Sequence, residues 1–167
     1  MNTLIYFQSA IAFGMGIISL YMVYMLMNRY IKKAIDLQET NAAYAILQSG
    51  VILSTALLVS SVIGPGINAI RFMNQDTFSW VNMTSSIGYI VLFLVIGIAF
   101  SLIVVAGGLI TFFQLTNINE WEEIKKNNIA VALISAALIL GLSIIVKEHI
   151  ASLCEALIPY PDVLNIR

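Results

Sequence analysis

Residues 129–146 read IAVALISAALILGLSIIV, a run of eighteen positions without a charged residue and rich in Ile, Leu and Ala. A helix of this length rises about 27 Å, close to the thickness of a bilayer's hydrocarbon core. Three other uncharged stretches are longer, and they cover Leu4 to Met27, Ala42 to Ile63 and Ile87 to Phe113. The chain is therefore predicted to cross a membrane four times.

The overall composition indicates the same class of protein. Of the 167 residues, 60% are hydrophobic and only 10% are charged, against about 25% charged in ordinary soluble domains. A soluble chain of this size needs a polar surface that so few charges cannot supply. Backbone polar groups cannot remain unpaired in lipid, so a spanning segment must be a helix or part of a closed β-barrel. The sequence lacks the ten-residue segments of alternating polarity that form barrel strands. The predicted fold is an all-α integral membrane protein with four transmembrane helices.

The scarcity of polar residues also narrows the function. A net charge of -1 argues against nucleic acid as a partner, and the single Cys154 excludes an internal disulfide and a multi-thiolate metal site. His149, the only histidine, lies five positions before Cys154, so the two do not share a helix face. No phosphate-binding loop or dinucleotide fingerprint is present. We therefore expect no enzymatic activity, no metal and no cofactor.

Cationic residues in the short loops predict the orientation, because they tend to remain on the cytoplasmic side. The first and third loops hold five of them, Arg29, Lys32, Lys33, Lys125 and Lys126, against Arg71, Lys147 and Arg167 on the opposite side. Both termini are therefore expected outside. No Lys or Arg precedes the first span, which is also longer than the apolar part of a signal peptide. The first span is thus expected to be retained.

A repeat becomes visible when the sequence is shifted by 87 positions. Asn41 to Ser54 then lies over Asn128 to Gly141, and five of the fourteen positions are identical. In both copies the block follows a charged loop and opens a predicted span. We interpret the chain as a duplicated two-helix hairpin. Because each unit holds an even number of spans, the two repeats are expected to be parallel.

The second copy also carries the residues of a known family. Residues 119–133 read NEWEEIKKNNIAVAL, and this stretch resembles the YjfL-like bacterial membrane proteins, the family of domain of unknown function 350. Their pattern is an acidic residue before Ile, then Gly or Asn followed by Asn, then Ala alternating with Val or Ile. The first copy departs from it at Thr40. The resemblance implies a four-helix protein of the bacterial inner membrane, with some relatives linked to envelope stress, and no catalytic residue to carry over.

The asparagines of the repeat motif stand where helices are expected to begin. The side chain of Asn41 or Asn128 can accept a hydrogen bond from an otherwise unpaired amide of the first turn. Glu39, Glu122 and Glu123 are placed to complement the positive end of a helix. The expected role is helix capping, and the alternative is an anion or headgroup site at the paired helix starts.

Small residues recur four positions apart within the spans, a spacing that permits close approach of helix backbones in lipid. We expect these positions to form packing seams and, because they are numerous, to support a homo-oligomer. The seam residues are Gly14, Gly16, Gly50, Ser54, Gly97, Ser101, Ala132, Ala136, Ala137 and Gly141.

Asn41, Gln48 and Thr55 are seven positions apart and therefore share one face of the second span. The expected interpretation is a stripe that forms hydrogen bonds between helices, and the alternative is a pore or solute-facing strip. No Asp, Glu, Lys, Arg or His lies within a predicted span. A proton relay, a voltage sensor and an ion-coupled pump are therefore not expected.

Gly64-Pro65-Gly66 is predicted to end the second span, because proline and glycine break helices. The expected organisation is a first two-helix repeat over 1–66, an interfacial connector over 67–86, a second two-helix repeat over 87–158 and a C-terminal tail over 159–167.

Three functions are compatible with these features. The first is an oligomeric structural or sensing component of the bacterial inner membrane, in envelope stress or phage defence, that engages a cytoplasmic protein partner through its charged loops. The second is an uncoupled channel or small-solute conduit lined by the second span. The third and least favoured is an enzyme subunit or lipid-modifying protein. The lipid bilayer is a partner in all three.

Overall fold

The computed structural model describes the backbone of residues 2–35, 40–73 and 80–158, and the side chains of residues 10–35, 40–72 and 87–158. Over these ranges the backbone is helical apart from short connecting segments, with no strand. Four helices are long and apolar enough to cross a membrane, as the sequence predicts. The elements are α1 (Asn2–Ile35), α2 (Ala42–Met73), α3 (Trp80–Leu115), α4 (Glu120–Lys125) and α5 (Ile129–Ala156).

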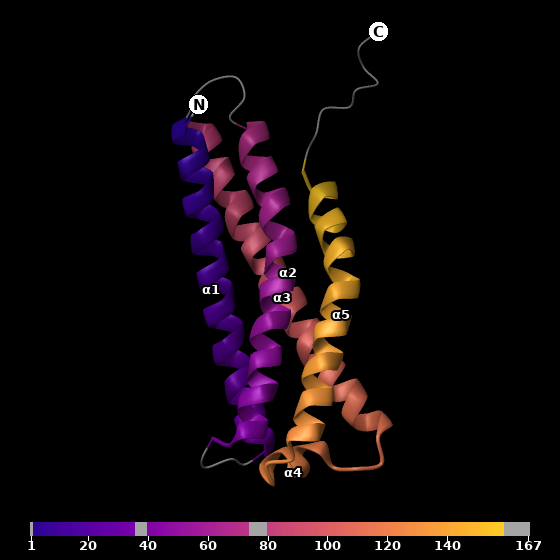
Figure 1. Cartoon of the computed structure of the whole chain (residues 1–167). Helices are drawn as coiled ribbons and strands as arrows, with labels where there is room; N and C mark the ends of the chain where they lie inside the picture. Colours follow the sequence, from indigo (N-terminus) through magenta and orange to yellow (C-terminus); the bar gives the residue numbers. More distant parts are fainter. Residues whose placement is uncertain (1, 36–39, 74–79, 159–167) are drawn as a thin grey trace.

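The four long helices run up and down within one bundle (Figure 1). α1 and α3 descend toward the end where α4 lies, and α2 and α5 start from that end, so α2 and α5 are parallel. We call this end of the bundle the motif end. α2 contacts each of the other long helices, and its contact with α5 is the most extensive in the bundle. α2 is therefore the central helix.

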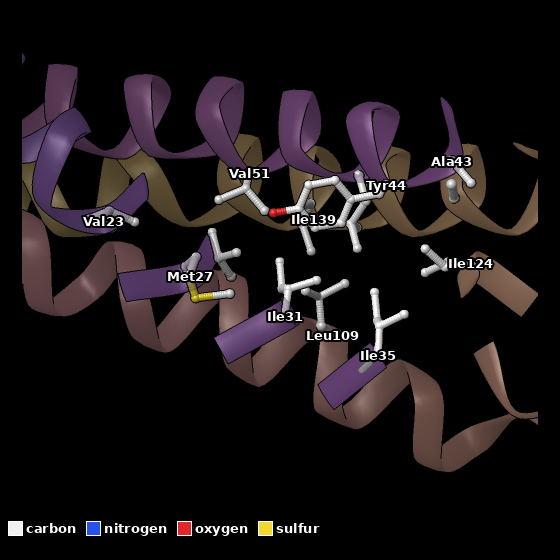
Figure 2. Close-up of a cluster of buried hydrophobic side chains, with 13 residues drawn as sticks. Val23, Met27, Ile31, Ile35, Ala43, Tyr44, Val51, Leu109, Ile124 and Ile139 are labelled. Atoms are coloured by element: carbon white, nitrogen blue, oxygen red, sulfur yellow. The ribbon is translucent and has the colours of Figure 1, made fainter. Parts of the chain in front are cut away.

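The buried side chains form two clusters. The first includes Val23, Met27, Ile31 and Ile35, a stripe of residues four apart along α1. Figure 2 shows how the other helices complete this cluster, with Tyr44 from α2, Leu109 from α3, Ile124 from α4 and Ile139 from α5. The second cluster includes Met15, Leu58, Val62, Phe93, Ile150 and Cys154. The short helix α4 thus belongs to the core through Ile124.

The outward surface of the bundle is also apolar. Phe13 is 72% exposed, Ile145 is 67% exposed and Ile103 is 65% exposed. In water such a surface drives aggregation, whereas hydrocarbon solvates it without cost. Only 22% of the most apolar window of α1, and 22% of that of α3, is buried within the chain. These two helices therefore present most of their side chains to lipid.

The expected helix end at Gly64-Pro65-Gly66 is wrong, because α2 continues through Pro65 to Met73. Proline removes one backbone hydrogen bond, but unwinding the helix in lipid leaves several backbone groups unpaired, which costs more. The expected connector is helical over 67–73 and 80–86. Its position at the membrane interface stays a prediction, and the tail over 159–167 lies outside the described residues.

Candidate functional site at the motif end

The turn between α4 and α5 depends on two consecutive asparagines. Asn127 has a φ of 65°, a left-handed conformation that asparagine tolerates better than most residues. Its amide donates to the carbonyl of Ile124 at 3.0 Å, and the next amide donates to the carbonyl of Glu123 at 2.8 Å. Asn127 therefore ends α4, and the chain is ready to begin α5 one residue later.

Asn128 is the N-cap of α5. Its Oδ1 accepts from the amides of Ala130 at 3.2 Å and Val131 at 3.4 Å. Its Nδ2 donates to Oε2 of Glu123 at 2.9 Å, and Oε1 of the same carboxylate accepts from Lys126 at 3.2 Å. The hydrogen bond from Asn128 and then that from Lys126 hold the pKa of Glu123 below its ordinary value. The cap therefore includes a charged carboxylate.

Asn41 ties the start of α2 to α4. Its Oδ1 accepts from the amide of Tyr44 at 2.8 Å, which is a capping bond. Its Nδ2 donates to the carbonyls of Ile124 at 2.9 Å and Lys125 at 3.1 Å. In return, Oδ1 of Asn127 accepts from the amide of Ala43 at 2.9 Å. First-turn amides of α2 and α5 thus donate to asparagine side chains, an arrangement that supports capping rather than anion binding. Glu39 lies outside the described residues.

A polar cluster lies between α1 and α2 one to two turns from Asn41. Nε2 of Gln48 donates to the Tyr44 hydroxyl at 2.9 Å and to Oδ1 of Asn28 at 3.1 Å. The Tyr44 hydroxyl donates to the same oxygen of Asn28. Lys32 lies with its ammonium 5.9 Å from the centre of the Tyr44 ring, where a cation is attracted to the aromatic face. Asn28, Tyr44 and Gln48 therefore join the two helices by side-chain hydrogen bonds.

The predicted polar stripe thus has three different environments. Asn41 bonds to α4 and Gln48 bonds to α1. Thr55 is buried and donates to the carbonyl of Val51 in its own helix at 2.8 Å. Sequence reasoning missed Asn28, which follows the last residue of the expected first span, and Tyr44, whose aromatic ring masks a polar hydroxyl. The spacing of four between Tyr44 and Gln48 was the available signal.

The small residues fall into two groups. At Gly50 the backbone approaches α5 so closely that a Cβ would lie 2.6 Å from Cβ of Ala136, and at Gly97 a Cβ would lie 2.8 Å from the Val62 side chain. A Cβ at Gly14, Gly16 or Gly141 meets nothing within 4 Å. Of the other seam residues, Ser54, Ser101 and Ala132 are buried, and Ala137 is exposed. Gly50 and Gly97 therefore pack helices against each other within one chain. Gly14, Gly16, Gly141 and Ala137 remain accessible to a helix of another chain.

The side chains at the motif end offer hydrogen bonds and charges. Among the described residues, no three His, Cys, Asp or Glu side chains gather to hold a metal ion. On α5, His149 is exposed whereas Cys154 is buried, so these two side chains do not form a pair.

These features define a multi-pass α-helical membrane protein whose helix starts are held together by asparagine side chains. The chain belongs to the family described as Domain of Unknown Function (DUF350), whose sequence profile matches residues 1–150. The match includes α1 to α4 and most of α5. No curated protein and no solved structure matches the chain significantly.

Proposed function

We propose that this protein is an oligomeric structural or sensing component of the bacterial inner membrane, without enzymatic activity. The observation that carries this proposal is the use of the polar residues of α2. Asn41, Gln48 and Thr55 form hydrogen bonds within the chain, to α4, α1 and their own helix. Side chains engaged in this way stabilise a bundle and are poorly placed to conduct a solute.

The open small residues support assembly into an oligomer. Gly14 and Gly16 on α1 and Gly141 on α5 permit close approach of another helix, and no helix of the same chain fills that space. Light scattering of the detergent-solubilised protein tests this. Gly14→Leu and Gly141→Leu are expected to reduce the mass of the complex, and Val95→Leu, on the exposed side of α3, is the matched control. An unchanged mass in both glycine variants contradicts the oligomer.

The charged motif end supports a cytoplasmic protein partner, in envelope stress or phage defence. Arg29, Lys32 and Lys33 are exposed near the end of α1, and Lys126 is exposed directly after α4, at the same end of the bundle. A photo-crosslinking residue in place of Lys33 is expected to capture a heavier species in cells, whereas one in place of Glu148 near the other end is not. Identical products at both positions contradict a partner at the motif end.

A conduit is the second candidate, and one observation favours it. The buried oxygens Oγ of Ser19, Oε1 of Gln48 and Oγ of Ser54 have no hydrogen-bond partner. Buried polar atoms of this kind are commonly satisfied by water, and an aqueous path needs such polar atoms along it. A flux measurement separates this candidate from the structural role.

A further inference from the structure

We propose that a pocket at the motif end, between α1, α3 and α4, binds the primary ammonium group of an ethanolamine-headgroup lipid. The pocket has a volume of about 370 Å³. Its polar and aromatic lining consists of Tyr30, Phe113, Gln114, Asn119, Glu120 and Trp121. This inference goes beyond the proposed function and does not depend on it.

The carboxylate of Glu120 is the feature that favours a cationic ligand. Glu120 is the first residue of α4, is only 2% exposed, and its buried Oε1 has no hydrogen-bond partner. Among the described residues, no Lys or Arg side chain pairs with it. A buried carboxylate without a partner is costly, because its charge has lost water and gained no compensating contact. A bound cation supplies the missing partner.

Aromatic rings around the pocket select for a cation. Trp121 packs edge to face against Phe113, with ring centres 4.6 Å apart, and against Tyr30, with ring centres 6.3 Å apart. Aromatic faces attract ammonium groups, most strongly where water is excluded. The carboxylate and the carboxamide oxygen of Gln114 are hydrogen-bond acceptors in the same pocket. These acceptors can bind a primary ammonium, which carries three N–H donors. They form no hydrogen bond with a quaternary ammonium, which carries none.

The depth of the pocket favours a lipid as the source of this ammonium. Gln114 is the second-last residue of the apolar span of α3, and Tyr30 lies near the end of the span of α1. The pocket therefore lies where hydrocarbon gives way to headgroups, the level at which Trp and Tyr accumulate. Lys32 and Lys33 are exposed at the same end and offer positive charge to a lipid phosphate.

The experiment uses the full chain in phospholipid-free detergent, with Trp80→Phe so that Trp121 is the only tryptophan. Short-chain phosphatidylethanolamine is expected to change the Trp121 emission in a saturable manner, whereas phosphatidylglycerol and phosphatidylcholine are not. Glu120→Gln is nearly isosteric and removes the charge, so it is expected to weaken binding at least about tenfold. Glu122→Gln, an exposed carboxylate on the same helix, is the matched control and is expected to bind normally.

Equal binding by Glu120→Gln and the parent protein overturns the proposal, as does equal binding of phosphatidylglycerol. Free ethanolamine tests whether the ammonium belongs to a lipid. If it binds as tightly as phosphatidylethanolamine does, the lipid assignment is overturned and the pocket is a site for a soluble ammonium. If Glu120→Gln does not fold, the melting temperature of the parent protein with each lipid tests the site instead. Phosphatidylethanolamine is expected to raise it more than phosphatidylglycerol does, and equal effects contradict the site.

Discussion

Asparagine side chains make most of the specific contacts at the motif end. Asn127 adopts the left-handed conformation that ends α4, and Asn128 caps α5. This turn requires a residue that tolerates a positive φ, followed by a residue that caps a helix well. Gly or Asn meets the first requirement and Asn meets the second, which explains the family pattern at these two positions. Asn41 differs, because it both caps α2 and donates to α4.

The Tyr44 hydroxyl and Gln48 are expected to contribute to stability as a unit. Tyr44→Phe removes the hydroxyl that bonds both Asn28 and Gln48, whereas Gln48→Leu leaves the bond between Tyr44 and Asn28 intact. Each variant therefore removes two of the three hydrogen bonds and leaves one. Each such bond in a membrane bundle is worth about 0.6 kcal/mol, so both variants are expected to lower the unfolding free energy by a similar amount, about 1 kcal/mol. The double variant is expected to lose less than the two single losses combined, and strict additivity in detergent unfolding contradicts a shared cluster.

The carboxylate of Glu123 is expected to make the motif end sensitive to acid. Its pKa is lowered in the folded protein by the hydrogen bonds from Asn128 and Lys126. A lowered folded pKa stabilises the fold above the ordinary value of 4.5, and this stabilisation is lost as the pH falls through the folded pKa. The melting temperature is therefore expected to fall below pH 4.5, and Glu123→Gln is expected to lack that part of the fall. Glu122→Gln should retain it, and the same acid response in both variants refutes the assignment.

Among the elements, α2 and α5 form the central pair. They are parallel (Figure 1), each begins at the motif end beside an asparagine, and their backbones approach each other closely at Gly50 and Ala136. The duplication of a two-helix unit stays a prediction from the sequence. Close packing also compensates for the absence of a hydrophobic driving force in lipid.

Gly50→Ala is expected to destabilise the protein, because its new Cβ would lie 2.6 Å from Cβ of Ala136. Inserting a methyl group into a packed contact costs about 1 to 3 kcal/mol. Gly14→Ala is the matched control, since its Cβ meets nothing within 4 Å and alanine favours a helix by about 1 kcal/mol. Thermal unfolding in detergent measures both changes, and equal stability of the two variants would show that the contact is not close.

The sequence alone was sufficient for the class of fold, because a bilayer forces charge-free stretches of about 20 residues into spanning helices. It was misleading at Pro65, where the breaking effect of proline is weaker than the cost of exposing backbone to lipid. It did not distinguish Gly50, which packs inside the chain, from Gly141, which does not, because spacing carries no information about which neighbour a face meets. The burial of Glu120 depends on how α4 packs against the long helices of the bundle, and nothing local in the sequence indicates it.

For the whole molecule, the two ends of the bundle differ. α1 starts and α5 ends at one end, and the caps, α4 and the exposed lysines lie at the other. With both termini proposed outside, the motif end faces the cytoplasm, where its cations favour it. The motif end is then expected to present its charged residues to the cell interior.

Cysteine labelling tests this orientation. Lys33→Cys, at the motif end, is expected to be shielded from a membrane-impermeant thiol reagent in intact cells and to react after lysis. Gln75→Cys, in the segment between α2 and α3, is expected to react in intact cells. Cys154→Ser provides the cysteine-free parent for both variants. Reaction at Lys33→Cys but not at Gln75→Cys would reverse the orientation.

The most direct test of a structural rather than conducting role is flux through proteoliposomes containing the purified, assembled protein. Because Asn41, Gln48 and Thr55 of α2 form hydrogen bonds within the bundle, the vesicles are expected to be as impermeable to small ions and neutral solutes as protein-free vesicles. Flux that depends on the protein and disappears in a folded Gln48→Leu variant, through drying of an aqueous path, would contradict the structural role and establish a conduit.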